Sequence, residues 1–121
     1  MDSDYIADLF SAFGPVDVRR MFGGLGIYAE GTMFALVYDG AVYLKADEAT
    51  IGTFRREGAA PFSYAAKNGR RAVMSYWRLP DRLYDDPGEL ARWAAEALAT
   101  ARRSAAPGRK AKARTARRPR R

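Results

Sequence analysis

The last twenty residues limit what this chain can fold into more than any other segment does. Residues 102–121 contain ten lysines and arginines, no acidic residue and no aromatic residue. Such a segment cannot bury enough apolar surface to offset the conformational entropy lost on ordering. The first 101 residues hold 11 basic and 14 acidic side chains, so the net charge of +7 arises in the C-terminal segment. We therefore expect one folded domain over residues 1–101 and a disordered tail over residues 102–121.

The part expected to fold has the size and composition of one globular domain. About 100 residues suffice for a single hydrophobic core, and 48% of the whole chain is hydrophobic. No apolar run approaches the roughly 20 residues that a membrane-spanning helix needs. The N-terminus begins with acidic residues and lacks the apolar stretch of a secretory signal. We therefore expect a cytoplasmic protein with no membrane partner.

Histidine and cysteine are both absent from the sequence. Their absence excludes disulfides, thiolate nucleophiles, imidazole bases and nearly every zinc, haem or iron–sulfur site. The chemistry that remains is that of Asp, Glu, Lys, Tyr and Ser. We therefore expect no metal and no cofactor.

The middle of the chain has the pattern of an antiparallel β-sheet. Short runs of Val, Ile, Tyr and Phe alternate with Glu30-Gly31 and Asp39-Gly40, which favour two-residue hairpin turns. A second hairpin is predicted around Asn68-Gly69. The predicted strands are Val16–Phe22, Leu25–Glu30, Thr32–Tyr38, Ala41–Ala46, Phe62–Ala66 and Ala72–Leu79.

Three helices are predicted around these strands. Apolar residues spaced i, i+3, i+4 and i+7 predict a helix from Ser3 to Phe13, and a similar stripe follows Asp86. Asp47 is expected to cap a short helix, and the segment from Asp86 to Glu89 resembles a capping box. The order of elements indicates a two-layer α+β domain. Its antiparallel sheet is a meander plus a hairpin, with the helices packed on one face.

A glycine-rich segment near residue 20 is the most distinctive stretch of the predicted domain. It does not match the dinucleotide fingerprint or the P-loop, because both lead into a helix and these glycines lead into a strand. A glycine bulge or a tight connection between strands is expected instead. The distinctive residues, interpreted as structural, are Arg20, Met21, Phe22, Gly23, Gly24, Gly26 and Tyr28.

This segment resembles the N-terminal domain of the TfoX/Sxy family. Tyr43-Leu44-Lys45, Phe62-Ser63-Tyr64 and Met74-Ser75-Tyr76 follow in the order that the family has. The resemblance covers about residues 4–101 and does not extend to the family's C-terminal helical domain. It implies a small two-layer α/β fold and a role in regulating natural competence genes with the cAMP receptor protein. A transcription regulator is therefore the implied protein partner of the folded domain.

The basic tail has three possible roles. A polycation binds phosphates by releasing counterions, with no readout of base sequence, so salt weakens it strongly. The alternatives are a solubilising end with no partner and a contact with anionic lipid, which normally needs a second, apolar signal. We expect binding to DNA or RNA. The residues predicted to contact nucleic acid are Arg102, Arg103, Arg109, Lys110, Lys112, Arg114, Arg117, Arg118, Arg120 and Arg121.

Pairs of acidic residues leave an enzymatic function open. They are Asp2 with Asp4, Asp47 with Glu48, and Asp85 with Asp86. Two carboxylates serve as acid and base when their environments separate their pKa values. These pairs lie at the ends of predicted helices, however, where capping is the commoner role. The tyrosines, Tyr5 and Tyr28 among them, are expected in the core or on the sheet.

These observations favour a non-enzymatic regulatory or adaptor protein, with no catalytic residue, that acts by binding. Two alternatives stay open: a small enzyme that uses carboxylate and tyrosine chemistry, and a homodimeric structural module with a merely solubilising tail. A pocket with two converging carboxylates beside a Lys or Arg would favour the enzyme. A flat aromatic surface would favour the binding protein.

Overall fold

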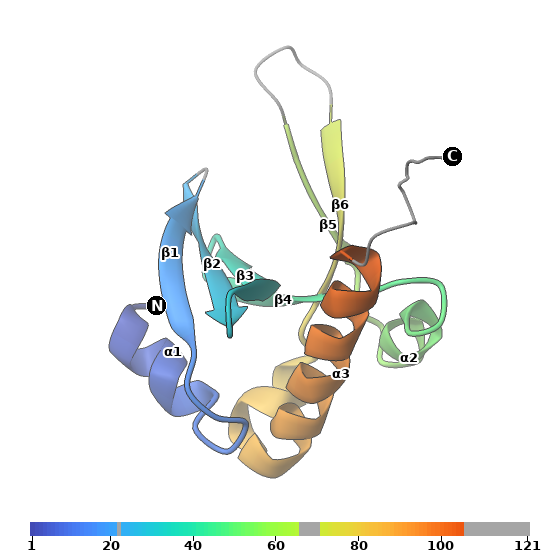
Figure 1. Ribbon diagram of the computed structural model, residues 1–121. Helices are drawn as coiled ribbons and strands as arrows, with labels where there is room; N and C mark the ends of the chain where they lie inside the picture. The colour runs from blue at the N-terminus through green and yellow to red at the C-terminus, as the bar shows by residue number, and fades with distance from the viewer. Residues whose placement is uncertain (22, 66–70, 106–121) are drawn as a thin grey trace, which may run out of the picture.

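Helices and strands form two layers in the computed structural model, which describes residues 1–21, 23–65 and 71–105 (Figure 1). The predicted α+β class, antiparallel sheet and three helices are confirmed, and a short 3-10 helix, η1, was not predicted. The elements in chain order are α1 (Ser3–Leu9), β1 (Asp17–Met21), β2 (Gly24–Ala29), β3 (Thr32–Tyr38), β4 (Ala41–Lys45), α2 (Ile51–Arg56), β5 (Pro61–Ala65), β6 (Arg71–Arg78), η1 (Asp81–Asp85) and α3 (Pro87–Ala105).

The six strands form one antiparallel sheet in the order β1-β2-β3-β4-β6-β5. Strands β1 to β4 pair as consecutive neighbours, which is the predicted meander. Strand β6 pairs with both β4 and β5, so that β1 and β5 are the edges of the sheet. Figure 1 shows the β1–β2 and β5–β6 hairpins rising on either side of β3 and β4.

Two tight turns set the register of the meander. Strands β2 and β3 are joined through Glu30-Gly31, and β3 and β4 through Asp39-Gly40, as predicted. The φ angles are 50° and 82° in the first turn and 50° and 77° in the second. Positive φ at both turn residues matches the twist of the flanking strands, and glycine adopts it without strain. Asn68-Gly69 lies outside the described residues.

A bulge lies where β3 pairs with β2. Ile27 pairs with Ala35, but the next residue, Tyr28, pairs with Met33, which leaves Phe34 as the extra residue. Phe34 and Ala35 both belong to the main hydrophobic cluster, whereas Met33 packs on the opposite face of the sheet. The bulge therefore keeps a large ring in the core and turns Met33 away from it.

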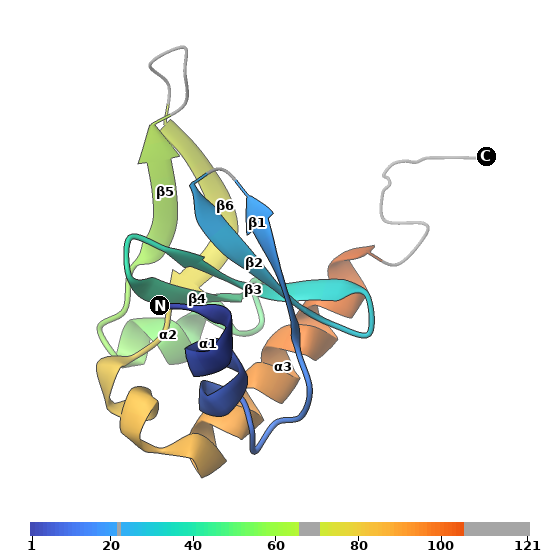
Figure 2. The same ribbon diagram turned by 90° about the vertical axis from the view of Figure 1, so that its left-hand side faces the viewer.

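All three α-helices pack against one face of the sheet, as predicted, and Figure 2 shows them on the same side. Phe10 of α1 meets Phe34 of β3 edge to face, with ring centroids 5.6 Å apart. Phe54 of α2 meets the ring of Trp93 on α3 in the same way at 5.1 Å. The largest fully buried side chains of this helix-side cluster are Phe10, Phe34, Ile6, Ile27, Leu44, Leu79, Leu83, Leu90 and Val42.

Helix α1 is shorter than predicted. It ends at Leu9, and the chain reaches Phe13 through tighter turns, in which the Phe13 N–H donates to the carbonyl of Phe10. Tyr5, expected to be in the core, is 45% exposed. It precedes the buried Ile6 and lies off the apolar stripe, so a helix turns its side chain toward solvent.

Helix α2 begins later than predicted, so Asp47 is not its cap. The Asp47 carboxylate accepts a hydrogen bond from the Ala49 N–H at 3.0 Å, and the Thr50 hydroxyl accepts one from the Asp47 N–H at 3.0 Å. These two bonds close a turn, and the helix starts only at Ile51. Asp47 thus serves the turn that leads from β4 into α2.

Helix α3 begins as predicted but ends later. Asp86 Oδ1 accepts the Glu89 N–H at 3.1 Å, which confirms the cap. The Glu89 side chain bonds to Arg82 and Trp93 and does not close a capping box. The helix continues to Ala105, four residues past the predicted end of the domain. Alanine is the best helix former, and residues 97, 99, 101 and 105 are alanines.

Candidate functional site

Two of the ten basic residues predicted to contact nucleic acid lie on α3. Arg102 Nη2 is 2.6 Å from Glu30 Oε1, and Arg103 Nη2 is 3.2 Å from Asp47 Oδ2. These ion pairs hold the last turn of α3 against the β2–β3 turn and the β4–α2 connection, so both arginines belong to the folded domain and not to a disordered tail. The predicted contacts outside the described residues are Arg109, Lys110, Lys112, Arg114, Arg117, Arg118, Arg120 and Arg121.

The Asp47 carboxylate is held in its ionised form by the groups around it. Partial burial acts to raise its pKa. The hydrogen bond and charge of Arg103, with the backbone N–H groups of Ala49 and Thr50, outweigh burial and lower the pKa of Asp47 below its usual range. The ion pair with Arg103 therefore persists at neutral pH.

The glycine-rich segment forms the β1–β2 hairpin, which is the tight strand connection expected from the sequence. Met21 pairs with Gly24 across the end of the hairpin, and Gly23 has a φ of 78° in the turn. Arg20 is exposed on β1. Phe22 lies outside the described residues.

Two glycines of this hairpin stand where a side chain has no room. A Cβ atom at Gly24 would overlap the carbonyl oxygen of Val37 on β3. A Cβ atom at Gly26 would lie 2.9 Å from Met21 Sδ and 3.1 Å from both Met33 Sδ and Tyr28 Cε1. The glycines therefore let neighbouring strands approach closely and let two methionines and a tyrosine cover the gap at residue 26.

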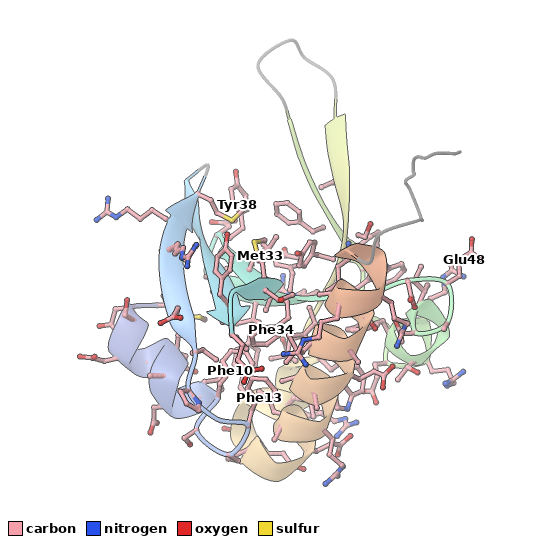
Figure 3. All side chains as sticks on the ribbon, in the orientation of Figure 1. Phe10, Phe13, Met33, Phe34, Tyr38 and Glu48 are labelled. Atoms are coloured by element: carbon pink, nitrogen blue, oxygen red, sulfur yellow. The ribbon has the colours of Figure 1, made fainter. Side chains whose placement is uncertain are left out.

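The face of the sheet opposite the helices, called the open face below, carries a second cluster. Leu36, Phe62 and Tyr76 are buried in it. In Figure 3, Met33 and Tyr38 point into the space between the two hairpins, away from the helix-side phenylalanines. The open face consists of Arg19, Met21, Gly26, Tyr28, Met33, Leu36, Tyr38, Tyr43, Lys45, Phe62 and Tyr76.

Aromatic rings and basic side chains contact one another on the open face. The Arg19 guanidinium lies 4.4 Å from the ring centroid of Tyr28, and Lys45 Nζ lies 5.3 Å from that of Tyr76. Burial, with a smaller contribution from Tyr28, raises the pKa of Tyr76 to about 12. The hydroxyl of Tyr76 is therefore neutral at physiological pH.

Sequence reasoning placed the tyrosines in the core or on the sheet, and Arg19 and Met33 in predicted strands, but it did not foresee that they gather on one face of the sheet. The missed signal lies in β3, where apolar residues occupy consecutive positions from Met33 to Tyr38. A strand of that kind is buried on both faces, whereas strict alternation marks a strand with one solvated face.

A second candidate site is a pocket of about 350 Å³ between α2 and α3, lined by Lys45, Arg92, Glu89 and Glu96 among others. This is the residue combination that an enzyme would need. The two glutamates, however, are seven residues apart on α3, a rise of about 10 Å along the helix axis, so they do not converge. Glu96 Oε2 lies 3.8 Å from Nη2 of Arg103, a residue that is not part of the pocket lining.

Glu89 is bound in an ion-pair network that joins three elements. Arg82 of η1 contacts Glu57 of α2 at 2.7 Å and Glu89 of α3 at 2.8 Å, and Trp93 Nε1 donates to Glu89 at 3.2 Å. The hydrogen bonds from Arg82 and Trp93 lower the pKa of Glu89 to about 2, and Arg82 likewise lowers the pKa of Glu57. A carboxylate ionised at neutral pH has no proton to donate. This network serves helix packing, and none of the described residues form an acidic cluster that could hold a metal ion.

A sequence model of the TfoX N-terminal domain matches residues 8–101, which run from α1 nearly to the end of α3. The chain belongs to the TfoX N-terminal domain family. Its curated relatives include the protein Sxy of Escherichia coli (strain K12) and the DNA transformation protein TfoX1 of Aliivibrio fischeri (strain ATCC 700601 / ES114). Each is 29% identical to this chain over 89 residues, which are 74% of this chain.

The match confirms the resemblance to the N-terminal domain of the family that the sequence indicated. The chain spans 40% of the length of Sxy and 42% of the length of TfoX1. In this TfoX N-terminal domain, the matched residues include both faces of the sheet and the β1–β2 hairpin. The helices among the described residues are all too short or too polar to cross a membrane.

Proposed function

We propose that this TfoX N-terminal domain protein is a non-enzymatic regulator that acts in the cytoplasm by binding. Its folded domain docks on a protein of the transcription machinery, and its C-terminal segment attracts DNA or RNA. The observation that carries the proposal is the family match over residues 8–101. One relative is named for DNA transformation, and we extend a regulatory role in that process to this chain.

The distribution of charge supports a division of labour between the two parts. Residues 1–105 hold 13 basic and 14 acidic side chains, so the folded domain is nearly neutral. Residues 106–121 add eight basic side chains and no acidic one. Attraction to phosphate therefore concentrates in the C-terminal segment, where it has no sequence preference.

The nucleic-acid part of the proposal is tested in the full chain by replacing the eight basic residues after residue 105 with glutamine. Affinity for a 20-base-pair DNA duplex is measured across a salt series. We expect affinity to fall at least tenfold and the salt dependence to flatten, since the slope follows the number of phosphates contacted. The control is the triple variant Arg55→Gln, Arg56→Gln, Arg92→Gln on the helix side, which should bind like the wild type. Equal affinity of the tail variant and the wild type would refute the proposed role.

The regulatory part is tested in the cell of origin. Deleting the gene should lower the frequency of DNA transformation and the transcript levels of DNA-uptake genes, and the wild-type chain should restore both. If transformation and transcript levels are the same without the protein, the regulatory assignment is wrong.

A further inference from the structure

The tyrosines of the open face leave part of their surface accessible. Leu36, Phe62 and Tyr76 are already buried there, but Tyr28, Tyr38 and Tyr43 are only half-buried. All the described α-helices pack on the other face. Aromatic rings presented on a sheet are surfaces on which unpaired nucleic-acid bases stack.

Basic side chains lie among these rings. Arg19 lies over Tyr28, and Lys45 lies over Tyr76. The β1 edge of the sheet also carries an acidic residue, Asp17, which lies opposite Tyr28 where β1 pairs with β2. Single-stranded nucleic acids bind where cations that contact phosphates lie among aromatic rings on which bases stack. The neutral hydroxyl of Tyr76 adds no repulsion toward phosphate.

The end of α3 lies beside the same face. A hollow of about 340 Å³ is lined by Met33, Lys45 and Tyr76 from the sheet and by Ala101 and Ser104 from the helix. The ion pair of Arg102 with Glu30 fixes this last turn of α3. The chain therefore passes the rim of the open face just before the basic residues that follow residue 105 in the sequence.

We propose that the open face binds single-stranded nucleic acid. Bases stack on Tyr28 and the neighbouring rings, and phosphates contact Arg19 and Lys45. This proposal rests on the nucleic-acid role given above and adds a site and a preference to it. The preference is for single strands because duplex bases are stacked on one another and cannot lie flat on a sheet.

Charge argues for an anionic occupant over the chain's own C-terminal segment. That segment carries eight positive charges, and on this face Arg19 and Lys45 already lie over two of the rings. The positive charges of the segment are repelled by Arg19 and Lys45. The negative charges of a phosphate backbone are attracted by these two residues and by the segment.

The first test compares two labelled probes, a 20-nucleotide oligothymidine and a 20-base-pair duplex, by fluorescence anisotropy with the full chain. We expect the single strand to bind more tightly than the duplex. Tyr28→Leu removes the ring and should weaken binding of the single strand at least about fivefold, because stacking of each base contributes that much. Tyr28→Phe keeps the ring and should bind like the wild type. Equal binding of the two probes, unchanged by Tyr28→Leu, would overturn the proposal.

The second test concerns charge. The double variant Arg19→Gln, Lys45→Gln should weaken oligothymidine binding and reduce the slope of log affinity against log salt by about 0.7 for each phosphate that the variant no longer neutralises. The matched control, Arg56→Gln, Arg92→Gln, removes two charges from the helix side and should change the slope little. If both double variants reduce the slope equally, the face has no special role.

The third test does not depend on loss of binding. Trp77 and Trp93 both pack in or against the helix-side cluster, so a stacked base on the open face should leave their emission unchanged. Tyr28→Trp places an indole on the open face, and oligothymidine should quench its emission. Quenching no greater than in the wild type would contradict stacking at this position.

The same variants separate the two proposals. If the eight-glutamine variant binds both probes as tightly as the wild type and keeps a Tyr28-dependent preference for oligothymidine, the open face binds on its own and only the role of the segment fails. If that variant binds oligothymidine more tightly than the wild type, the segment itself occupies the face and the present proposal is wrong. It is equally wrong if open-face substitutions abolish capture of a protein partner and leave oligonucleotide binding unchanged.

Discussion

The single residues that matter most in this structure are glycines at positions where a side chain would meet its neighbours. Gly24 lies against the backbone of β3, and Gly26 lies beneath Met21, Met33 and Tyr28. The Arg-Met-Phe-Gly-Gly-Leu-Gly segment is noticeable in the sequence because glycine is rare inside strands. The structure gives each glycine its own reason: Gly24 lies too close to the β3 backbone to admit a methyl group, whereas a methyl group at Gly26 would displace the ends of the Met21, Met33 and Tyr28 side chains.

We predict that Gly24→Ala destabilises the fold by about 1–3 kcal/mol, since the added methyl group would displace the backbone of β3. Gly52→Ala is the matched control, because its Cβ atom would meet Arg56 Nη1 at an ordinary 3.5 Å inside α2. That change should be neutral or stabilising by up to about 1 kcal/mol, as alanine favours helices. Urea unfolding of both variants decides the matter, and equal stabilities would contradict the packing.

Individual contacts between distant residues could not be predicted from the sequence. The pattern of charge assigns Arg102 and Arg103 to the tail, because every charged residue from Arg102 onward is basic. Their partners, Glu30 and Asp47, lie 72 and 56 residues earlier in the chain. Only the tertiary fold brings these residues together, so composition could not separate the last turn of the helix from the segment after it.

At the scale of elements, the same residue type has two outcomes in this chain. Asp86 caps α3, which starts at the next residue with Pro87. Asp47 looks equivalent in the sequence, but Thr50 bonds back to it and closes a turn first. Both helices could be predicted from the sequence. The start of α2 moves to Ile51 because the Thr50 hydroxyl bonds to the backbone N–H and carbonyl of Asp47.

Loss of the α3 cap should be measurable. We expect Asp86→Ala to lower the free energy of unfolding by about 1 kcal/mol, because the Glu89 N–H would lose its acceptor. Asp85→Ala, one residue before, removes the same charge outside the cap position and should cost less than half as much. Thermal unfolding of the pair provides the comparison, and an equal loss in both variants would argue against a capping role.

The joint between η1, α2 and α3 predicts a dependence of stability on pH. Arg82 lowers the pKa values of Glu57 and Glu89 in the folded protein from an ordinary value of 4.5, to about 2 for Glu89. Folding therefore favours the ionised carboxylates, so this stabilisation is complete above about pH 5 and is lost as pH falls toward 2. We expect wild-type stability to fall more steeply over this range than that of Arg82→Gln. Urea titrations from pH 7 to pH 2 test this, and parallel curves would contradict it.

At the scale of the whole molecule, the meander could be predicted from its turns, but the position of the last two strands in the sheet could not. Glu30-Gly31 and Asp39-Gly40 indicated the meander correctly. The open face depends on β6 pairing with β4, which brings Tyr76 beside Lys45. That pairing joins strands separated by a helix and another strand, and no local pattern in the sequence encodes it.

The limit of the folded domain gives a further prediction. A chain ending at Ala105 should unfold at the same temperature as the full chain. One ending at Ala101 lacks the last turn of α3, and with it the ion pairs of Arg102 with Glu30 and of Arg103 with Asp47. It should be less stable by about 1 kcal/mol, which lowers the melting temperature by a few degrees. Calorimetry of the three chains measures this. Identical melting of the two shorter chains would place the domain boundary at 101 after all.

The sheet divides the apolar residues into a cluster backed by helices and a smaller one on the open face. Most of the buried volume, and hence most of the stability, lies on the helix side. Tyr38 and Tyr43 are half-buried and pack edge to face on Phe62, so removing either ring should cost less stability than removing a fully buried ring on the helix side. During evolution, the helix side can hold the fold constant while the sequence of the open face varies.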